Sequence, residues 1–130
     1  MFAKETLKRI IEFIKGVRMK KISFKYKGRK VSIEVKECRG FARGLGLMFK
    51  SRETDALIFK FNKPVKMAIH SWFVFFPFVA VWLDKKNKLV DIRKVKPFKL
   101  SVKPRGYYSK LIEIPINKKH NGILRLLVGN

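Results

Sequence analysis

The apolar positions along the chain follow a helical spacing at its start and a strand-like spacing afterwards. Over residues 2–17 they fall on one arc when consecutive residues are rotated by about 100°. The residues of this stripe are Leu7, Ile10, Ile11, Ile14 and Val17, with Phe2 and Phe13 at its edge. We predict an N-terminal amphipathic helix within residues 1–20 that packs its apolar side on the rest of the domain. The alternative is that the same side docks on a membrane surface, which the lysines of the opposite side favour.

From residue 22 the spacing changes to a period of two, which is typical of strands. In the segments ISFKY (22–26) and VSIEV (31–35), apolar residues alternate with polar ones. Gly28 lies between the two segments and has the conformational freedom that a tight turn needs. The pattern predicts a β-hairpin.

Further apolar segments follow, and turn-forming residues separate several of them. These segments span residues 56–61, 65–72, 78–83, 88–95, 98–102, 109–114 and 122–128. Many short strands at such spacing are typical of an all-β sandwich or barrel. We therefore predict a mainly β fold with a single domain over residues 1–130. It would be a two-sheet sandwich or flattened barrel of short, mostly antiparallel strands over residues 21–130, preceded by the one N-terminal amphipathic helix.

The segment HSWFVFFPFVAVW (70–82) carries no formal charge when its histidine is neutral, and the uncharged stretch extends from residue 67 to residue 83. As a helix it would be too short for a hydrocarbon layer of about 30 Å, and Pro77 would interrupt it. Its Phe, Val, Ile and Trp residues favour strands, so we predict two buried strands around Pro77. Strand alternation assigns Met67, Ile69 and Phe73 to one face of the first strand, and Phe78, Ala80 and Trp82 to one face of the second.

From about residue 31 onward, the order of several motifs is similar to that of a known family. The motifs are ARGLGLMFKS (42–51), DALIFKF (55–61), VKMAIHSWFVFFPFVAVWLDKKNKLVD (65–91), YYSKLIEIP (107–115) and the final VGN. The family's Gly-Leu-Met motif is matched at residues 46–48, its Met-containing strand at Met67, and its late Leu-x-Glu strand at Leu111 and Glu113. On these motifs the chain resembles the domain of unknown function 192 (DUF192) family.

This resemblance implies a β-rich, sandwich-like fold and supplies no established activity. The chain departs from the family at Val79, two residues after Pro77, where the family usually has Asp. Lys50 stands where an arginine often follows the Gly-Leu-Met motif.

Charge is the most unusual property of the composition. The chain has 32 Lys and Arg residues against 9 Asp and Glu residues, a formal net charge of +23 at pH 7. Such a surface attracts polyanions such as RNA, DNA or anionic lipid. Residues 13–33 and 92–112 contain no acidic residue and interleave basic with aromatic side chains. The candidate nucleic-acid-binding residues are Lys20, Lys21, Lys25, Arg29, Lys30, Arg93, Lys94, Lys103, Arg105, Tyr107 and Tyr108.

Cations beside aromatic rings are the combination that single-stranded nucleic-acid grooves use. The alternative is that the lysines keep a basic protein soluble while the aromatic residues fill its core. No motif in the sequence decides between the two readings.

Signals for catalysis and metal binding are few. His70 and His120 are the only histidines, and Cys38 is the single cysteine, so no intramolecular disulfide can form. His70 and Ser71 are adjacent and would point to opposite faces of a strand. Cys38 with His70 is conceivable as a nucleophile pair only if the fold brings them together. The spacing of cysteine and histidine matches no metal site, and we predict neither a metal nor a cofactor.

Glu113 is the most notable acidic residue, because it lies inside an apolar segment and matches the family pattern. If it is buried, we expect an arginine or lysine partner. Together with Met48, Met67 and His70 it forms a candidate ligand pocket.

These observations lead to one predicted function and two alternatives. We predict a non-enzymatic binding protein with affinity for polyanions such as nucleic acid. The alternatives are a small-ligand-binding or enzymatic pocket near Met48, Met67, His70 and Glu113, and a peripheral membrane-surface protein that docks through residues 2–17. The lone cysteine and a start whose apolar runs are interrupted by charges predict a cytoplasmic protein. A lysine-rich sequence without glutamine is typical of a thermophilic source.

Overall fold

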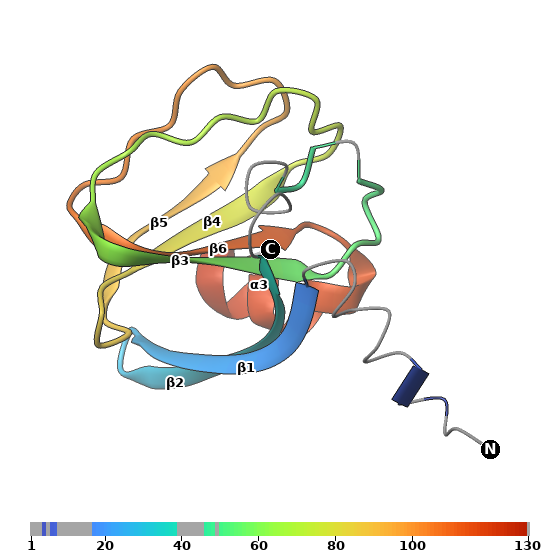
Figure 1. Ribbon diagram of the computed structural model, residues 1–130, viewed down its shortest axis with the longest axis horizontal. Coiled ribbons are helices and arrows are strands. Elements are labelled where there is room, and N and C mark those ends of the chain that lie inside the picture. The colour runs from blue at the N-terminus through green and yellow to red at the C-terminus, as the bar shows by residue number, and fades with distance from the viewer. Residues whose placement is uncertain (1–3, 5, 8–16, 39–45, 49, 130) are drawn as a thin grey trace.

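The computed structural model describes residues 4, 6–7, 17–38, 46–48 and 50–129, and its main feature is one six-stranded sheet (Figure 1). The strands lie in the order β1-β2-β3-β6-β4-β5. β2 and β3 pair in parallel, whereas the other neighbours pair antiparallel. In chain order the elements are β1 (Val17–Tyr26), β2 (Arg29–Cys38), β3 (Ala56–Val65), β4 (Phe78–Leu83), β5 (Leu89–Val95), β6 (Tyr108–Pro115), the short helix η1 (Lys118–His120) and α3 (Asn121–Val128).

The sheet curls into a half-barrel. β1, β2 and β3 are ten residues long, and the twist that accumulates along strands turns the β1–β2 hairpin below the rest of the sheet in Figure 1. The two edge strands, β1 and β5, therefore contact each other. The mainly β fold with mostly antiparallel strands is confirmed. The two-sheet sandwich is wrong for the described strands, because β3 and β6 hydrogen-bond to each other and join both halves into one sheet.

Apolar cores lie on both faces of this sheet. On one face, which we call the α3 face, Leu124 and Leu127 of α3 pack against the strands. On the other, the loop face, residues 66–77 and 96–107 cover the strands. The two loops run side by side along the top of Figure 1, and residues Ile69 and Val102 join them by a β-bridge. β4 is buried along its whole length, because alternate residues point into the two cores.

The first hairpin is longer than predicted, and this corrects the boundary of the predicted helix. β1 pairs residue by residue with β2 from Val17 to Tyr26. Lys27 and Gly28 form the turn with φ values of 51° and 77°, as the favoured two-residue hairpin turn requires. Residues 17–20 are therefore strand and not helix. The rest of the predicted helix lies mostly outside the described residues, so its packing and its membrane docking stay predictions.

The strands predicted at 56–61, 78–83, 88–95 and 109–114 are confirmed. Those at 65–72 and 98–102 are wrong, since beyond Val65 these segments form the two loops of the loop face. Within the described residues, no helix is long and apolar enough to cross a membrane.

The segment 122–128 was expected as a strand and is helix α3 instead. Leu124 and Leu127 lie three residues apart, which places both on the side of the helix that faces the core. The turn before the helix begins at Asn117, whose side-chain oxygen accepts a hydrogen bond from the backbone N–H of His120 at 3.2 Å.

The aromatic segment is only partly buried. Phe78, Ala80 and Trp82 lie in the core of the loop face, as strand alternation predicted. Met67 and Phe73 are 51% and 45% exposed, so their predicted place in the core is wrong. The reason is that residues 66–77 form a loop, in which side chains do not alternate between two faces as they do in a strand.

Two phenylalanines of this segment provide a matched test of the core. Phe78 is fully buried, and its replacement by alanine should lower the free energy of unfolding by about 3–5 kcal/mol. Phe75 is 60% exposed, and Phe75→Ala should change that energy by less than about 1 kcal/mol. Urea unfolding of both variants measures the difference. Equal losses would contradict the assignment of Phe78 to the core.

Candidate functional site

A cavity of about 250 Å³ opens on the loop face between the sheet and the 66–77 loop. All four residues of the predicted ligand pocket line it: Met48, Met67, His70 and Glu113. They come from three separate parts of the chain, namely the 46–48 turn, the loop after β3, and β6. The remaining lining is mostly apolar and comes from Gly46, Leu47, Phe59, Phe61, Ala68, Ile69, Val74, Tyr108 and Leu111. The fold therefore brings the predicted set together, and its role in binding stays a prediction.

Glu113 forms the polar part of the cavity wall. In β6 it pairs with Leu57 of β3 and Ala80 of β4. A Cβ atom at Gly46 would lie only 3.2 Å from the Glu113 carboxylate oxygen Oε1 and 3.4 Å from the Phe59 ring. Gly46 also has a φ of 52°, in the left-handed region. Both features call for glycine at this position, because any other side chain would be strained and would press on the carboxyl group.

The 66–77 loop forms the opposite wall of the cavity. Hydrogen bonds to the sheet and to the 96–107 loop hold it in place. The hydroxyl of Tyr108 donates to the backbone carbonyl of Met67 at 3.0 Å. Two residues later, the N–H of Ile69 donates to the carbonyl of Val102 at 2.9 Å. These bonds fix the loop segment that carries Met67 and His70 over the cavity.

Burial controls the charge of Glu113. Only 7% of the residue is exposed, and among the described residues no hydrogen bond or ion pair to its carboxyl group is found. Desolvation raises its pKa from 4.5 to about 8. The expected arginine or lysine partner is therefore absent from the described part of the chain, and the carboxyl group is mainly protonated at neutral pH. It can donate one hydrogen bond into an apolar space.

The groups that could act as nucleophiles are poorly placed for that role. Cys38 is buried, and this desolvation is the main cause that raises the pKa of its thiol to about 11. The negative charge of the nearby Glu113 contributes less to the same rise, and the thiol keeps its proton. It does not line the cavity, whereas His70 does. The Nδ1 atom of His70 accepts a hydrogen bond from the backbone N–H of Trp72 at 3.3 Å. In the part of the chain that is described, no three His, Cys, Asp or Glu side chains gather as metal ligands.

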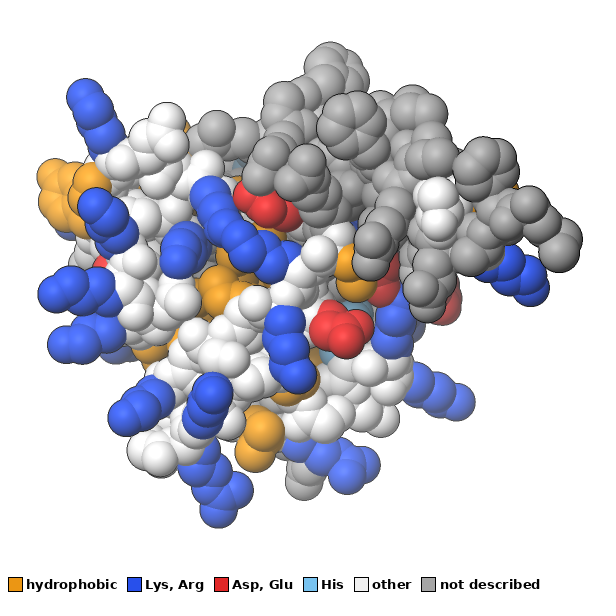
Figure 2. All heavy atoms as spheres, turned by 60° about the horizontal axis from the view of Figure 1, so that its bottom comes forward, with side chains coloured by type: hydrophobic (Ala, Val, Ile, Leu, Met, Phe, Trp, Pro, Cys, Tyr) orange, Lys and Arg blue, Asp and Glu red, His pale blue; other side chains and the backbone are white. Residues whose placement is uncertain are grey.

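The basic residues of the first run lie on both sides of the β1–β2 hairpin. Lys25 and Lys30 are direct cross-strand partners that point away from the α3 face, and both are exposed. Lys21 lies on the same side, opposite Glu34. Lys20 lies on the other side, where its Nζ is 3.8 Å from Glu37, so it does not belong with them. Figure 2 shows Lys and Arg side chains spread across this side of the molecule.

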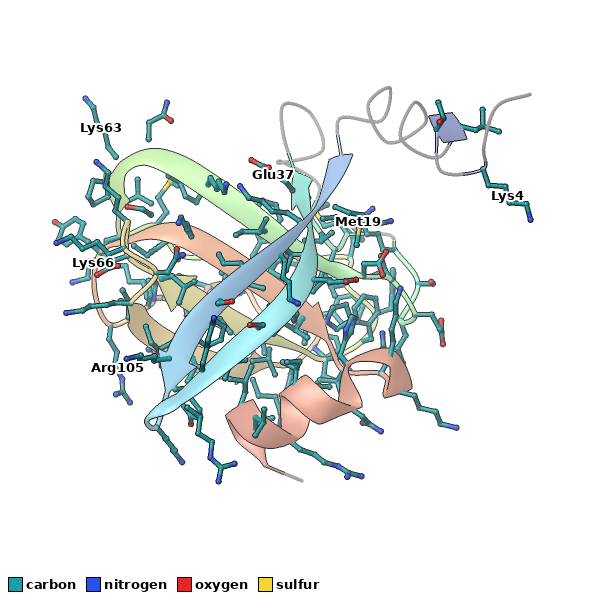
Figure 3. All side chains as sticks on the ribbon, turned by 90° about the horizontal axis from the view of Figure 1, so that it is seen from below. Lys4, Met19, Glu37, Lys63, Lys66 and Arg105 are labelled. Carbon is teal, nitrogen blue, oxygen red and sulfur yellow. The ribbon has the colours of Figure 1, made fainter. Side chains whose placement is uncertain are left out.

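The second run is divided between ion pairs and exposed cations. Asp91 is 6% exposed and accepts hydrogen bonds from the Nε of Arg93 and the backbone N–H of Arg105, both at 3.1 Å. Figure 3 shows Arg105 near the end of the molecule where the hairpin turn lies. Lys94 and Lys103 are exposed.

The two tyrosines of the second run have opposite surroundings. Tyr107 is 65% exposed and Tyr108 only 1%, so base stacking on Tyr108 is excluded in this fold. Tyr108 instead lines the cavity and contacts the ring of Phe61 edge to face, with the ring centres 5.6 Å apart. Sequence reasoning missed this role and the anchoring role of Asp91. The only signal for Asp91 was a carboxylate inside the apolar segment 88–95.

Val79, where the resemblance led us to expect Asp, is fully buried on the α3 face. It pairs with Ile114 of β6. A carboxylate at this position would lie in an apolar core, which is unfavourable without a partner. The departure from the family pattern therefore contributes an apolar side chain to the packing.

Comparisons with known proteins agree with this fold. The model of the DUF192 family, described as "Uncharacterized ACR", matches residues 22–121. A "putative transcription regulator" from Sinorhizobium meliloti 1021 has a similar crystal structure, with a TM-score of 0.69 and 12% identity over 83% of this chain and 88% of the other. The crystal structure of a protein of unknown function from Novosphingobium aromaticivorans DSM 12444 is also similar. Its TM-score is 0.68, with 15% identity over 85% of this chain and 81% of the other. At these identities the likeness shows the fold alone. None of the curated proteins matches the chain.

Replacing Glu113 by glutamine should remove one pH dependence of stability. Because the folded-state pKa is raised from 4.5 to about 8, the folded protein keeps a proton that the unfolded chain releases. The free energy of unfolding should therefore fall as the pH rises through this window and level off above it. The variant lacks this proton, so its stability relative to the wild type should increase over the same window. Urea unfolding at a series of pH values measures this, and parallel profiles would contradict a buried, neutral Glu113.

Proposed function

The chain belongs to the DUF192 family, whose description assigns no activity, and we propose that it is a non-enzymatic binding protein for a small, mainly apolar ligand with one polar group. The observation that carries the proposal is a buried carboxyl group that faces an apolar cavity without a partner among the described residues. Buried polar groups normally have hydrogen-bond partners, and a ligand would supply one to Glu113.

The size and lining of the cavity define the ligand. Its volume of about 250 Å³ lies just below the usual range for drug-sized ligands of about 300–1,000 Å³. The ligand should therefore be small. Met48 and Met67 flank the cavity with flexible thioether side chains, and Phe59 and Phe61 supply aromatic walls. Such a lining suits apolar or aromatic ligands of variable shape.

The protonation state of Glu113 defines the polar group. A protonated carboxyl donates a hydrogen bond, so the ligand should carry an acceptor such as a carbonyl or hydroxyl oxygen. A cationic ligand is disfavoured by the net charge of +23. Binding should weaken as the pH rises through about 8, because a ligand that covers an ionised Glu113 would leave a charge desolvated.

Methionine methyl NMR provides a direct test with small neutral aromatic compounds, of which 2-naphthol and indole-3-carbaldehyde are the first probes. Met48 and Met67 line the cavity, whereas Met19 on β1 lies outside it. In protein labelled at the methionine methyl groups, we expect a binding probe to shift the resonances of Met48 and Met67 and to leave that of Met19 unchanged.

Two variants complete this test. Ala68 lines the cavity and is exposed, so Ala68→Phe should obstruct it without changing the core and should abolish the shifts. Leu126→Phe on the exposed side of α3 is the matched control and should bind like the wild type. Shifts that persist in Ala68→Phe, or that affect Met19 equally, would reject the cavity as the binding site.

Nucleic-acid binding on the β1–β2 hairpin is the second candidate function. Its specific support is the cross-strand pair Lys25 and Lys30, because like charges directly opposite each other in a sheet are unfavourable unless an anion lies between them. Lys27 and Arg29 at the turn add to this positive group, and Lys27 lies 5.3 Å from the centre of the Tyr26 ring. A phosphate backbone would relieve the repulsion.

The salt dependence of binding distinguishes this site from net charge alone. Each phosphate contact to a single strand contributes about −0.7 to the slope of log affinity against log salt. Replacing Lys21, Lys25, Arg29 and Lys30 by glutamine should flatten that slope for a single-stranded oligonucleotide. Replacing the exposed and separated Lys50, Lys63, Lys86 and Lys118 is the control. If both variants flatten the salt slope equally, oligonucleotide binding depends on the net charge and not on a site at the hairpin.

A further inference from the structure

A cluster of apolar side chains projects from the two loops of the loop face. Trp72, Phe75, Phe98 and Leu100 are 44–69% exposed, and Phe73 is 45% exposed. We call these five residues the aromatic tip. The ring centres of Phe75 and Phe98 lie 5.4 Å apart, and those of Trp72 and Phe73 lie 6.2 Å apart. Large contiguous apolar patches are uncommon on the surfaces of soluble proteins and mark interaction surfaces.

The tip is held in place from below. Ser71 is fully buried, and its hydroxyl donates to the carbonyl of Lys96 at 2.7 Å and accepts from the N–H of Lys99 at 2.6 Å. Its backbone N–H also donates to the carbonyl of Lys99 at 2.9 Å. One small side chain thus ties the 66–77 loop to the 96–107 loop at the base of the tip.

The backbone of the tip is strained at two aromatic residues. Phe73 and Phe98 have φ values of 57° and 60°, in the left-handed region that bulky residues rarely adopt. Such strain persists only where the surrounding structure enforces it, and it concentrates at functional positions. Here it occurs at two exposed rings, so the fold keeps an unfavourable backbone at the residues that it presents to the outside.

The two loops that form the tip carry charge of one sign. Residues 56–83 and 92–112, which include both loops, contain no acidic residue. Lys96 and Lys99 are exposed and lie beside the tip, because both are bonded to Ser71 through their backbones. Aromatic side chains bordered by lysines match the interface of an anionic bilayer, where the rings enter the headgroup region and the cations meet phosphates.

We propose that the aromatic tip docks the protein on membranes that contain anionic phospholipid. Stacking on single-stranded nucleic acid fits the geometry less well. The rings of Phe75 and Phe98 are inclined by 80°, so the edge of one ring meets the other, and the most exposed member, Leu100, has no stacking face. Tryptophan and aliphatic side chains gain from burial at a lipid interface. The tip uses residues other than those of the cavity and the hairpin, so the proposal is independent of both.

Trp72 reports directly on this docking, because the other tryptophan, Trp82, is fully buried. The whole protein is mixed with vesicles of phosphatidylcholine and phosphatidylglycerol, and with vesicles of phosphatidylcholine alone. We expect cosedimentation with the anionic vesicles, a blue shift of the tryptophan emission, and quenching of that emission by brominated lipids. Cosedimentation without a change in emission would overturn the proposal, since net charge alone would then explain the binding.

Matched variants locate the surface. The variant with Trp72→Ser, Phe98→Ser and Leu100→Ser should lower the vesicle partition coefficient by at least about tenfold. Leu126→Ser with Val128→Ser removes apolar side chains that are 43% and 41% exposed on α3, and this control should bind like the wild type. If the triple variant unfolds, Leu100→Ser alone replaces it, because this residue is 69% exposed and its loss should still weaken binding.

Two further results would overturn the proposal. One is a folded tip variant that binds anionic vesicles like the wild type. The other is a tip variant that loses affinity for a single-stranded oligonucleotide while it keeps its affinity for vesicles, which would assign the tip to nucleic acid. A parallel loss of vesicle binding and of the emission change, with the control unaffected, supports membrane docking.

Discussion

The burial of β4 on both faces is the constraint on which the rest of the structure depends. A strand with apolar residues at every position must be covered from two sides, and this chain has one described α-helix long enough to cover one of them. The loop face is covered by two loops. Loops have many backbone polar groups without strand or helix partners, so they can cover an apolar core only where other groups satisfy them. The cavity lies where this loop cover meets the sheet.

A few polar side chains make such a cover stable. Ser71, Tyr108 and Asp91 each bond to backbone groups of a loop, and each is buried. Among the described residues, the indole N–H of Trp82 is buried without a hydrogen-bond partner. The carboxyl group of Glu113 is also largely desolvated, and it lies in the cavity wall. Burying such groups without partners costs free energy. For Glu113 this cost is reduced because its carboxyl group keeps its proton and is therefore uncharged.

The sequence pattern predicted two kinds of strand. In the β1–β2 hairpin, apolar and polar residues alternate between core and solvent, and in segment 78–83 every residue is apolar and buried. The pattern could not distinguish 65–72 and 98–102 from strands, because their composition is strand-like and only the lack of a neighbouring strand makes them loops. Segment 122–128 was too short for its spacing to separate helix from strand. The pocket residues were identified from their positions in apolar segments and family motifs.

Other contributions to the site depend on three-dimensional approach and left no signal in the sequence. The contact of Gly46 with Glu113 and the hydrogen bonds of Ser71 join residues far apart in the chain. Tyr107 and Tyr108 are neighbours in sequence, yet one is exposed and the other buried. A pattern of basic and aromatic residues cannot decide which of two adjacent rings faces the solvent.

The insertion of β6 between β3 and β4 also has a consequence for synthesis on the ribosome. Because β6 follows β3 and β4 in the chain, the edges of β3 and β4 that pair with it stay unpaired until β6 has left the ribosome. Until then the nascent chain is open to edge-to-edge aggregation.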